Sequence, residues 1–352
     1  MRRAVRARGF SQSSSETGPV RPGPPGPSGQ VMSGAVRARG FTAGVVAIAL
    51  GACSGSSGTQ TFDAVPTTIA VTPTTAPPPP VDCGIAVASY APSGGLPSPG
   101  AMPSGTFMEQ IQARGRIIAG VSADTLLFGY RNPLSGNLEG FDIDLVHQVS
   151  QAIFGDPNRV EYKVVTYAQR IPALLDGSVD IVADVMTVNC TRWQQIAFSS
   201  QYFDAGQKVL VRSDSVAATI DDLDGTRMCA ATGSTNIDEL KNHPKITAVP
   251  VDDISDCMVL FQQGTVDSVT GDDTVLQGFK VQDPYTKIIG PAITSEPYGL
   301  GIARTHPEFV QFVNSVLQRM RVDGTWKQMY SRWLQPTGPV PEPPPAVYGR
   351  NP

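Results

Sequence analysis

Between about residue 105 and residue 336, short runs of β-branched residues alternate with segments whose apolar residues recur at helical spacing. Residues 179–183 form such a run after the turn signal Asp176-Gly177, which predicts a short buried strand. Residues 144–154 carry apolar side chains three and four positions apart, which predicts an amphipathic helix. This alternation predicts an α/β fold of layered sheets and helices, long enough for two compact lobes.

The same patterns predict a full series of elements. Further strands are expected at residues 116–121, 160–166, 196–199, 207–211, 227–231, 246–251, 267–270 and 287–289. Further helices are expected at residues 107–114, 170–175, 235–242, 254–263, 274–280, 307–322 and 324–334. The Pro-rich tail, residues 337–352, is expected to be loose.

The loop after the strand at 179–183 carries the first candidate chemistry. Residues 184–189 should leave the carboxyl end of that strand, where open α/β sheets place their ligands. The hydroxyl of Thr187 and the guanidinium of Arg192 follow at close spacing. A planar guanidinium matches the two oxygens of a carboxylate, so this loop predicts a site for a small anion. An ion pair between Arg192 and a neighbouring aspartate is the alternative.

Residues 180–199, DIVADVMTVNCTRWQQIAFS, resemble the central motif of the family 3 extracellular solute-binding proteins of amino-acid ABC transporters. The resemblance runs collinearly over residues 107–335 and leaves out the first hundred residues. It implies a two-lobed, periplasmic-binding-protein-like (Venus flytrap) fold. Lobe 1 would comprise residues 105–203 and 300–336, and lobe 2 residues 204–299. Two crossing strands, near 204–211 and 297–303, would form the hinge.

The resemblance also implies roles for residues of both lobes. Arg192 and Thr187 would bind the α-carboxylate of an amino acid. Ser234 and Thr235 lie in a Gly turn between a strand and a helix, where backbone N–H groups suit an anion. Ser234 or Thr235 would in either case cap that helix. Asp272 matches the acid for the α-ammonium, with capping of the next helix as the alternative.

Five residues of lobe 1 are further candidates. Asp124 and Phe128 occupy the first loop, where the family places an acid and an aromatic wall, and Tyr167 matches an aromatic that stacks on the ligand. Packing in the core is the alternative for both aromatics. Arg170 resembles the arginine that binds a side-chain carboxylate in members specific for acidic amino acids; a surface salt bridge is the alternative. Asp184 stands where many members have a small residue, and it would add an acid near the cleft.

The first 52 residues read as a signal region. The heptapeptide AVRARGF occurs at residues 4–10 and again at 35–41, just after Met32, which we take as the true start. A basic segment, the apolar run 41–52 and Cys53 then follow. The run is too short to cross a bilayer, and LGAC resembles a lipobox in which Cys53 is acylated. An ordinary signal peptide is the alternative.

Cleavage before Cys53 would change the charge balance. The removed segment holds seven Arg and one Glu, so the 27 basic residues of the chain fall to 20 and the 31 acidic residues to 30. A net charge near −10 argues against nucleic acid as a partner and against a polybasic membrane contact. The membrane anchor would therefore be lipid on Cys53, and residues 53–104, rich in Pro, Ser and Thr, would be a tether.

Four cysteines remain when Cys53 is acylated, an even number that suits disulfides in an oxidising compartment. Cys229 and Cys257 fall in one predicted βαβ unit, so we prefer that pair. Cys83–Cys190 would then fasten the tether beside the central motif. Unpaired buried thiols are the alternative. The cysteine and histidine spacings match no metal site, and no cofactor is expected.

These patterns predict a secreted, monomeric lipoprotein on the outer face of the cytoplasmic membrane. It would bind a polar amino acid of the Glu/Gln/Asp/Asn class and deliver it to an ABC permease. Actinobacterial glutamine-binding lipoproteins are similar in their tether, four cysteines and tail. A sensor that signals to a membrane protein is the first alternative. An enzyme on the same fold is the second, and the absence of a nucleophile–base pair argues against it.

Overall fold

The computed structural model describes residues 82–92, 94–335 and 338–352. The predicted signal region, Cys53 and most of the tether lie outside these ranges. No helix within them combines the length and apolar character needed to cross a membrane. The described chain contains two separate larger β-sheets, each with five strands in a continuous order. We call them the sheets of lobe 1 and lobe 2.

The sheet of lobe 1 is formed by strands that come from three distant parts of the chain. Its order is β6 (Val160–Val164), β2 (Ile117–Val121), β7 (Ile181–Ala183), β15 (Gly301–Ile302) and β8 (Ala197–Phe198). Strand β2 runs parallel to β6 and β7, whereas β15 runs antiparallel to its neighbours. The apolar runs of the inner strands are fully buried, because helices cover a mostly parallel sheet on both faces.

The helices of lobe 1 match the predicted ones closely, except for α4, which was not predicted. They are α1 (Phe107–Arg114), α2 (Phe141–Phe154), α3 (Arg170–Leu175), α4 (Cys190–Trp193), α8 (Pro307–Asp323) and α9 (Thr325–Leu334). A small antiparallel sheet that the sequence patterns did not predict lies between β2 and α2. It consists of β3 (Asp124–Thr125), β4 (Gly129–Arg131) and β5 (Leu138–Glu139).

The sheet of lobe 2 has the order β11 (Thr247–Val251), β10 (Arg227–Ala231), β12 (Ser268–Asp272), β9 (Phe203–Arg212) and β13 (Thr286–Ile289). Each of its three helices follows a strand of this sheet, as in βαβ units, and α5 is the shortest of them, with five residues. These helices are α5 (Thr235–Glu239), α6 (Ile254–Gln262) and α7 (Asp273–Gln282).

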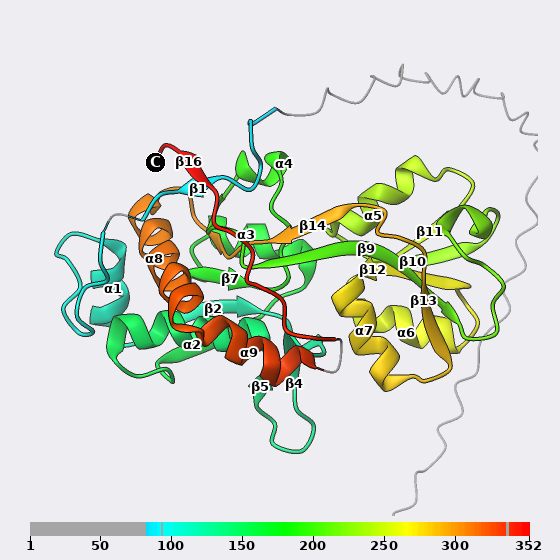
Figure 1. Cartoon of the computed structure of the whole chain (residues 1–352), viewed down its shortest axis with the longest axis horizontal. Coiled ribbons are helices and arrows are strands. Elements are labelled where there is room, and N and C mark those ends of the chain that lie inside the picture. Colours follow the sequence, from blue (N-terminus) through cyan, green and yellow to red (C-terminus); the bar gives the residue numbers. More distant parts are fainter. Residues whose placement is uncertain (1–81, 93, 336–337) are drawn as a thin grey trace, which may run out of the picture. The chain divides into compact units, whose positions relative to one another are not determined.

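Two antiparallel strands connect the lobes. Strand β9 is ten residues long, and β14 (Ser295–Tyr298) pairs with its first half, from Phe203 to Gly206. Figure 1 shows β9 and β14 side by side as they cross between the two sheets. The chain thus changes lobes twice at one place, which is the arrangement of a hinge. The predicted α/β architecture with two crossing strands is confirmed.

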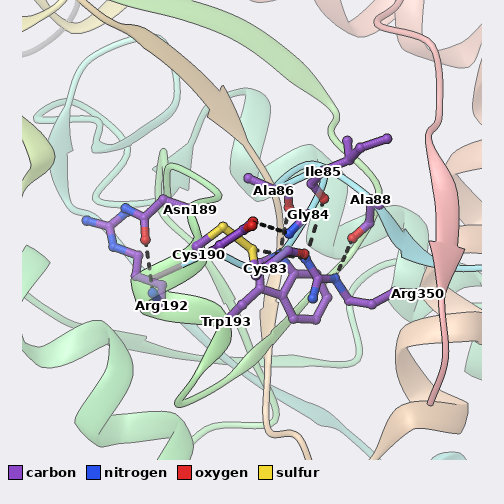
Figure 2. The surroundings of a disulfide bond; sticks show 11 residues. Cys83, Gly84, Ile85, Ala86, Ala88, Asn189, Cys190, Arg192, Trp193 and Arg350 are labelled. Carbon is purple, nitrogen blue, oxygen red and sulfur yellow. Dashed lines mark hydrogen bonds between the residues drawn. A yellow bond between two sulfur atoms is a disulfide. The ribbon is translucent and has the colours of Figure 1, made fainter. Parts of the chain in front are cut away.

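Both ends of the described chain fold onto lobe 1. The tail is not loose: β16 (Tyr348–Arg350) pairs in parallel with β1 (Ser89–Tyr90), within the stretch expected to be tether. The Arg350 guanidinium lies 4.1 Å over the Trp193 ring of α4 and donates to the Ala88 carbonyl at 2.9 Å (Figure 2). The prolines of the tail did not indicate this packing, because its contacts are made with residues that are distant in the sequence.

The two preferred disulfides are both present. Cys229 is bonded to Cys257 within lobe 2, and Cys83 is bonded to Cys190 at the start of α4. The Trp193 indole also donates to the Ala86 carbonyl at 2.8 Å (Figure 2). Residues 83–86, within the stretch predicted to be tether, are therefore held against the helix that carries Arg192.

Candidate functional site

Groups from both lobes converge on one small cavity beside the hinge. Its lining residues are Tyr167, Arg170, Val185, Thr187, Arg192, Ser234, Thr235, Asn236 and Asp272. Seven of the ten ligand-binding residues predicted from the sequence are among them. The cavity measures only about 10 Å³, which is space for about one water molecule. A solute of amino-acid size therefore enters only when the lobes move apart.

Arg192 is presented by the short helix α4. The Asn189 side chain caps this helix by accepting from the Arg192 backbone N–H at 2.9 Å. This bond fixes the backbone from which the Arg192 side chain extends. Its guanidinium donates to the Thr187 carbonyl at 2.7 Å and to the Gly233 carbonyl of lobe 2 at 3.1 Å. Burial lowers the pKa of Arg192 to about 9, and the Arg170 charge adds to this effect. A carboxylate in the cavity would offset both causes.

Arg170 is 2% exposed and bonded mainly to backbone. It donates to the carbonyls of Tyr167 at 3.0 Å and Asp184 at 2.8 Å in lobe 1, and to that of Gly233 at 3.3 Å in lobe 2. Its guanidinium also lies 4.3 Å from the centre of the Tyr167 ring. These contacts exclude the surface salt bridge considered from the sequence, and they give Arg170 a role in shaping the loop at Asp184.

Gly233 marks a point where the backbones of the two lobes approach each other closely. Its carbonyl accepts from both cleft arginines, and its φ of +78° lies in the left-handed region. A Cβ at this position would come within 2.7 Å of the Ala168 Cα in lobe 1. Only glycine therefore permits this degree of closure.

Replacing Gly233 by alanine is expected to hold the lobes apart, because the new methyl group meets backbone that cannot rotate away. We expect about a tenfold or greater loss of solute affinity, since a steric cost of about 1.4 kcal/mol on the closed state alone already corresponds to a tenfold change. Calorimetric titration measures this loss. Gly264→Ala also has a positive φ but no atom near its Cβ, and it should leave the affinity unchanged. Equal affinities in the two variants would contradict this reading of the cleft.

Asp272 ends strand β12 and is buried at the cleft. Its carboxylate accepts from the Asn236 amide at 2.8 Å and from the Tyr298 hydroxyl at 2.6 Å. Burial raises the pKa of Asp272, and the nearby Glu296 carboxylate raises it further. An ammonium group in the cavity would stabilise the charged form of this acid. The sequence analysis missed Asn236, although it follows Thr235 directly.

Ser234 acts as the cap of α5. Its hydroxyl accepts from the Ile237 N–H at 3.1 Å and donates to the Ala231 carbonyl at 2.7 Å. Ser234 therefore caps the helix, as the sequence analysis expected, and this role is compatible with binding.

Glu296 is a second residue that the sequence analysis missed. It belongs to the crossing strand β14, and its carboxylate accepts from the hydroxyls of Thr187 in lobe 1 and Thr235 in lobe 2, both at 2.6 Å. No pattern around Glu296 marks it, because its strand reads as an ordinary part of the hinge. Only the fold brings it between the two predicted threonines.

Three predicted residues do not line the cavity. Phe128 is fully buried against Phe203 and Tyr298, which is the core packing considered as its alternative. Asp124 accepts from the Ser255 N–H of lobe 2 at 3.0 Å, so it joins the lobes at another point of the cleft. Asp184 is buried next to the lining residue Val185 and does not line the cavity itself.

The Asp184 carboxylate is buried in surroundings that offer it no hydrogen bond among the described residues. It is 1% exposed, and neither oxygen has a hydrogen-bond partner among the residues that the structure describes. Burial raises its pKa to about 7, against the attraction of Arg170. The next residue, Val185, has a φ of +39°, a strained value for a β-branched side chain. Its N–H donates to Asp142 at 2.8 Å, and that bond and the arginine hold the strained loop in place.

A larger hollow of about 710 Å³ lies elsewhere on lobe 1, between β5, α2 and α9. It lies on one lobe only and contains none of the predicted ligand-binding residues. Two of its charged residues, Asp144 and Arg332, already pair with each other. Within the described ranges, no cluster of three or more His, Cys, Asp or Glu side chains is arranged to hold a metal ion.

Comparison with known proteins identifies relatives with this architecture. The family model of bacterial extracellular solute-binding proteins, family 3, matches residues 117–336. The chain is 31% identical over 227 residues to the ABC transporter glutamine-binding protein of Bacillus subtilis (strain 168), covering 64% of this chain and 83% of the relative. It is 36% identical over 199 residues to the glutamine-binding protein of Geobacillus stearothermophilus, covering 56% and 76%.

Among solved structures, an ancestral arginine-binding protein bound to glutamine matches with a TM-score of 0.59 and 30% identity. The match covers 63% of this chain and 98% of that one. This agreement confirms the two-lobed Venus flytrap fold. Because the family model covers well over half of the 352 residues, the chain belongs to family 3 of the bacterial extracellular solute-binding proteins, and it binds a solute rather than acting as an enzyme.

Proposed function

We propose that this protein captures a polar amino acid of the Glu/Gln/Asp/Asn class between its lobes and delivers it to an ABC permease. The observation that carries the proposal is the convergence of Arg192 and Thr187 from lobe 1 with Ser234, Thr235 and Asp272 from lobe 2 on one buried cavity. A guanidinium from one lobe and a carboxylate from the other suit the two charges of a zwitterion. The glutamine-binding relatives support the choice of a polar side chain.

The contacts between the lobes suggest how the solute drives closure. In the structure, the Gly233 carbonyl accepts from both Arg192 and Arg170. A bound α-carboxylate would replace this neutral acceptor with an ionised one, and charge-assisted hydrogen bonds are about twice as strong as neutral ones. A solute that bonds to both lobes stabilises the closed state by the difference in its affinity for the two states.

The same proposal places the protein outside the cytoplasmic membrane, anchored by lipid on Cys53. The two or three acyl chains of a lipoprotein cysteine give stable attachment where one chain would not. The disulfide between Cys83 and Cys190 joins the end of the tether to lobe 1. Lobe 1 would thus be the lobe linked to the membrane, and lobe 2 would move upon closure. The closed, monomeric protein would then dock on the permease.

Calorimetric titration of residues 54–352 with each of the twenty amino acids tests this function. We expect binding of at least one of glutamate, glutamine, aspartate and asparagine with micromolar or tighter affinity. A loss of uptake of that amino acid upon deletion of the gene would support delivery to a permease. Binding of none of the twenty would contradict the proposed function.

A further inference from the structure

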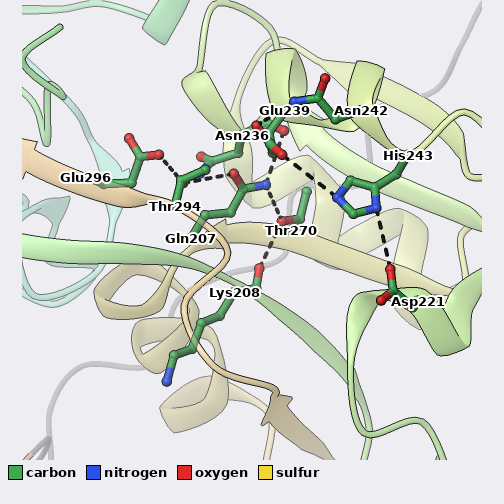
Figure 3. A network of polar contacts seen from close by, with 10 residues as sticks. All are labelled: Gln207, Lys208, Asp221, Asn236, Glu239, Asn242, His243, Thr270, Thr294 and Glu296. Carbon is green, nitrogen blue, oxygen red and sulfur yellow. Dashed lines mark hydrogen bonds and ion pairs between the residues drawn. The ribbon is translucent and has the colours of Figure 1, made fainter.

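Glu296 is a buried acid whose hydrogen bonds involve both lobes. It is 2% exposed. One carboxylate oxygen lies 2.6 Å from the Thr187 hydroxyl and 2.6 Å from the Thr235 hydroxyl. The other lies 2.5 Å from the hydroxyl of Thr294 on its own segment (Figure 3). Three hydroxyl groups therefore surround one carboxylate beside the predicted site.

The direction of these bonds follows from counting protons. A threonine hydroxyl has one hydrogen and two lone pairs, whereas an ionised carboxylate can only accept. Both threonines must therefore donate to Glu296. The two hydroxyl oxygens lie 3.4 Å apart and line the cavity, so toward the cavity they can present lone pairs but no proton.

We propose that Glu296 is a positioning residue that turns Thr187 and Thr235 into hydrogen-bond acceptors for the ammonium group of the solute. The inference rests on the proposed function. Without Glu296 these hydroxyls would be able to donate to the solute carboxylate, as their place beside Arg192 suggests. With Glu296 they join Asp272 in recognising the positive group, and the carboxylate is left to the guanidinium of Arg192. Glu296 thereby sets the preference for solutes that carry an α-ammonium group.

The hinge strands hold Glu296 in this position. Thr294 donates to Glu296 and lies 3.3 Å from the side-chain oxygen of Gln207 on β9. The Gln207 amide in turn donates to Thr270 at 2.9 Å and to the Asn236 carbonyl at 3.3 Å (Figure 3). Asn236 bonds to Asp272. The acid is thus fixed by both crossing segments, and it is connected to the acid expected to bind the ammonium.

The test compares affinities for an amino acid and for its deamino analogue, in which hydrogen replaces the ammonium group. It uses the purified full-length protein and whichever of glutamine, glutamate, asparagine and aspartate binds best. Glu296→Gln introduces an amide that can donate to one threonine and release that hydroxyl's proton toward the cavity. We expect the ratio of the two affinities to fall about tenfold or more, which corresponds to one hydrogen bond to a charged group.

Thr235→Val provides a second variant: it removes one acceptor from the cavity together with one of the three hydrogen bonds to Glu296, and it should lower the same ratio. Thr294→Val is the matched control: it also removes one hydrogen bond to Glu296, along with the contact to Gln207, but it removes no hydroxyl from the cavity and should leave the ratio unchanged. A ratio that stays constant in Glu296→Gln and Thr235→Val, even if both affinities fall equally, would overturn the inference. Failure of the unmodified protein to bind any amino acid would instead refute the proposed function.

Discussion

Arg192→Ala should lower the affinity for the bound amino acid by about a hundredfold or more. Arg192 is 8% exposed, and its guanidinium donates to lobe 2 through a neutral acceptor, the Gly233 carbonyl. A carboxylate left in a buried cleft without its cationic partner costs about 2–5 kcal/mol. Calorimetric titration of the variant measures this loss directly.

Two further variants make the result specific. Arg192→Lys keeps the charge but loses the planar pair of donors, so an intermediate affinity is expected. Arg304→Ala removes an exposed guanidinium of lobe 1 that donates to the Gln194 carbonyl, and it should leave the affinity within about twofold, as for most surface changes. Undiminished binding by Arg192→Ala would refute the assignment of the carboxylate to this residue.

Asp184→Asn should stabilise the protein at alkaline pH. The ordinary pKa of an aspartate is 3.8, and burial raises that of Asp184 to about 7 in the folded chain. Between these values the folded chain holds a proton that the unfolded chain has released. The contribution of Asp184 to the free energy of unfolding is therefore most favourable below pH 4 and falls as the pH rises through 7. Asparagine carries no charge to bury, so it should add about 2–4 kcal/mol at pH 8 and little at pH 4.

Thermal denaturation at both pH values measures this gain. The control is Asp176→Asn, an exposed aspartate of lobe 1 whose carboxylate accepts from the Ser178 N–H at 2.8 Å. Hydrogen bonds to Ser178 lower the pKa of Asp176, so its replacement should give no gain at pH 8. The prediction would be contradicted if Asp184→Asn had a lower midpoint of thermal unfolding at pH 8 than the unmodified protein. That result would show that the charged Asp184 carboxylate has a stabilising partner in solution.

The sequence was sufficient to predict the fold and the residues that a local motif carries. Thr187 and Arg192 follow one strand within a few positions, so a single loop determines both. Cys229 and Cys257 could be paired because one strand–helix unit contains them, and the structure confirms that bond. In each case, short-range geometry limits where the side chains can lie.

Glu296 could not be predicted in this way. It lies 109 residues from Thr187 along the chain, and only the pairing of the two crossing strands brings the two together. Phe128 illustrates the opposite error. Its place in the first loop suggested an aromatic wall, yet the ring turns into a cluster with Phe203 and Tyr298 from the hinge. Long-range packing determined the role of both residues.

Arg170 and the tail show why a residue type alone is an incomplete guide. An arginine near a cleft suggests a ligand, but the strained loop at Asp184 and Val185 uses this one to bind backbone carbonyls. Prolines suggested a loose tail, but Arg350 of that tail packs on Trp193. Neither partner is near in sequence, so no local pattern indicated the contact.

The central claim is that one amino acid bridges the lobes between Arg192 and Asp272. A crystal structure of the protein with its tightest-binding amino acid tests it most directly. The account predicts the α-carboxylate within hydrogen-bond distance of the Arg192 guanidinium, the ammonium within that distance of Asp272, and a Gly233 carbonyl displaced from Arg192. An amino acid found instead in the larger hollow of lobe 1, with the contacts between Arg192 and Gly233 intact, would contradict it.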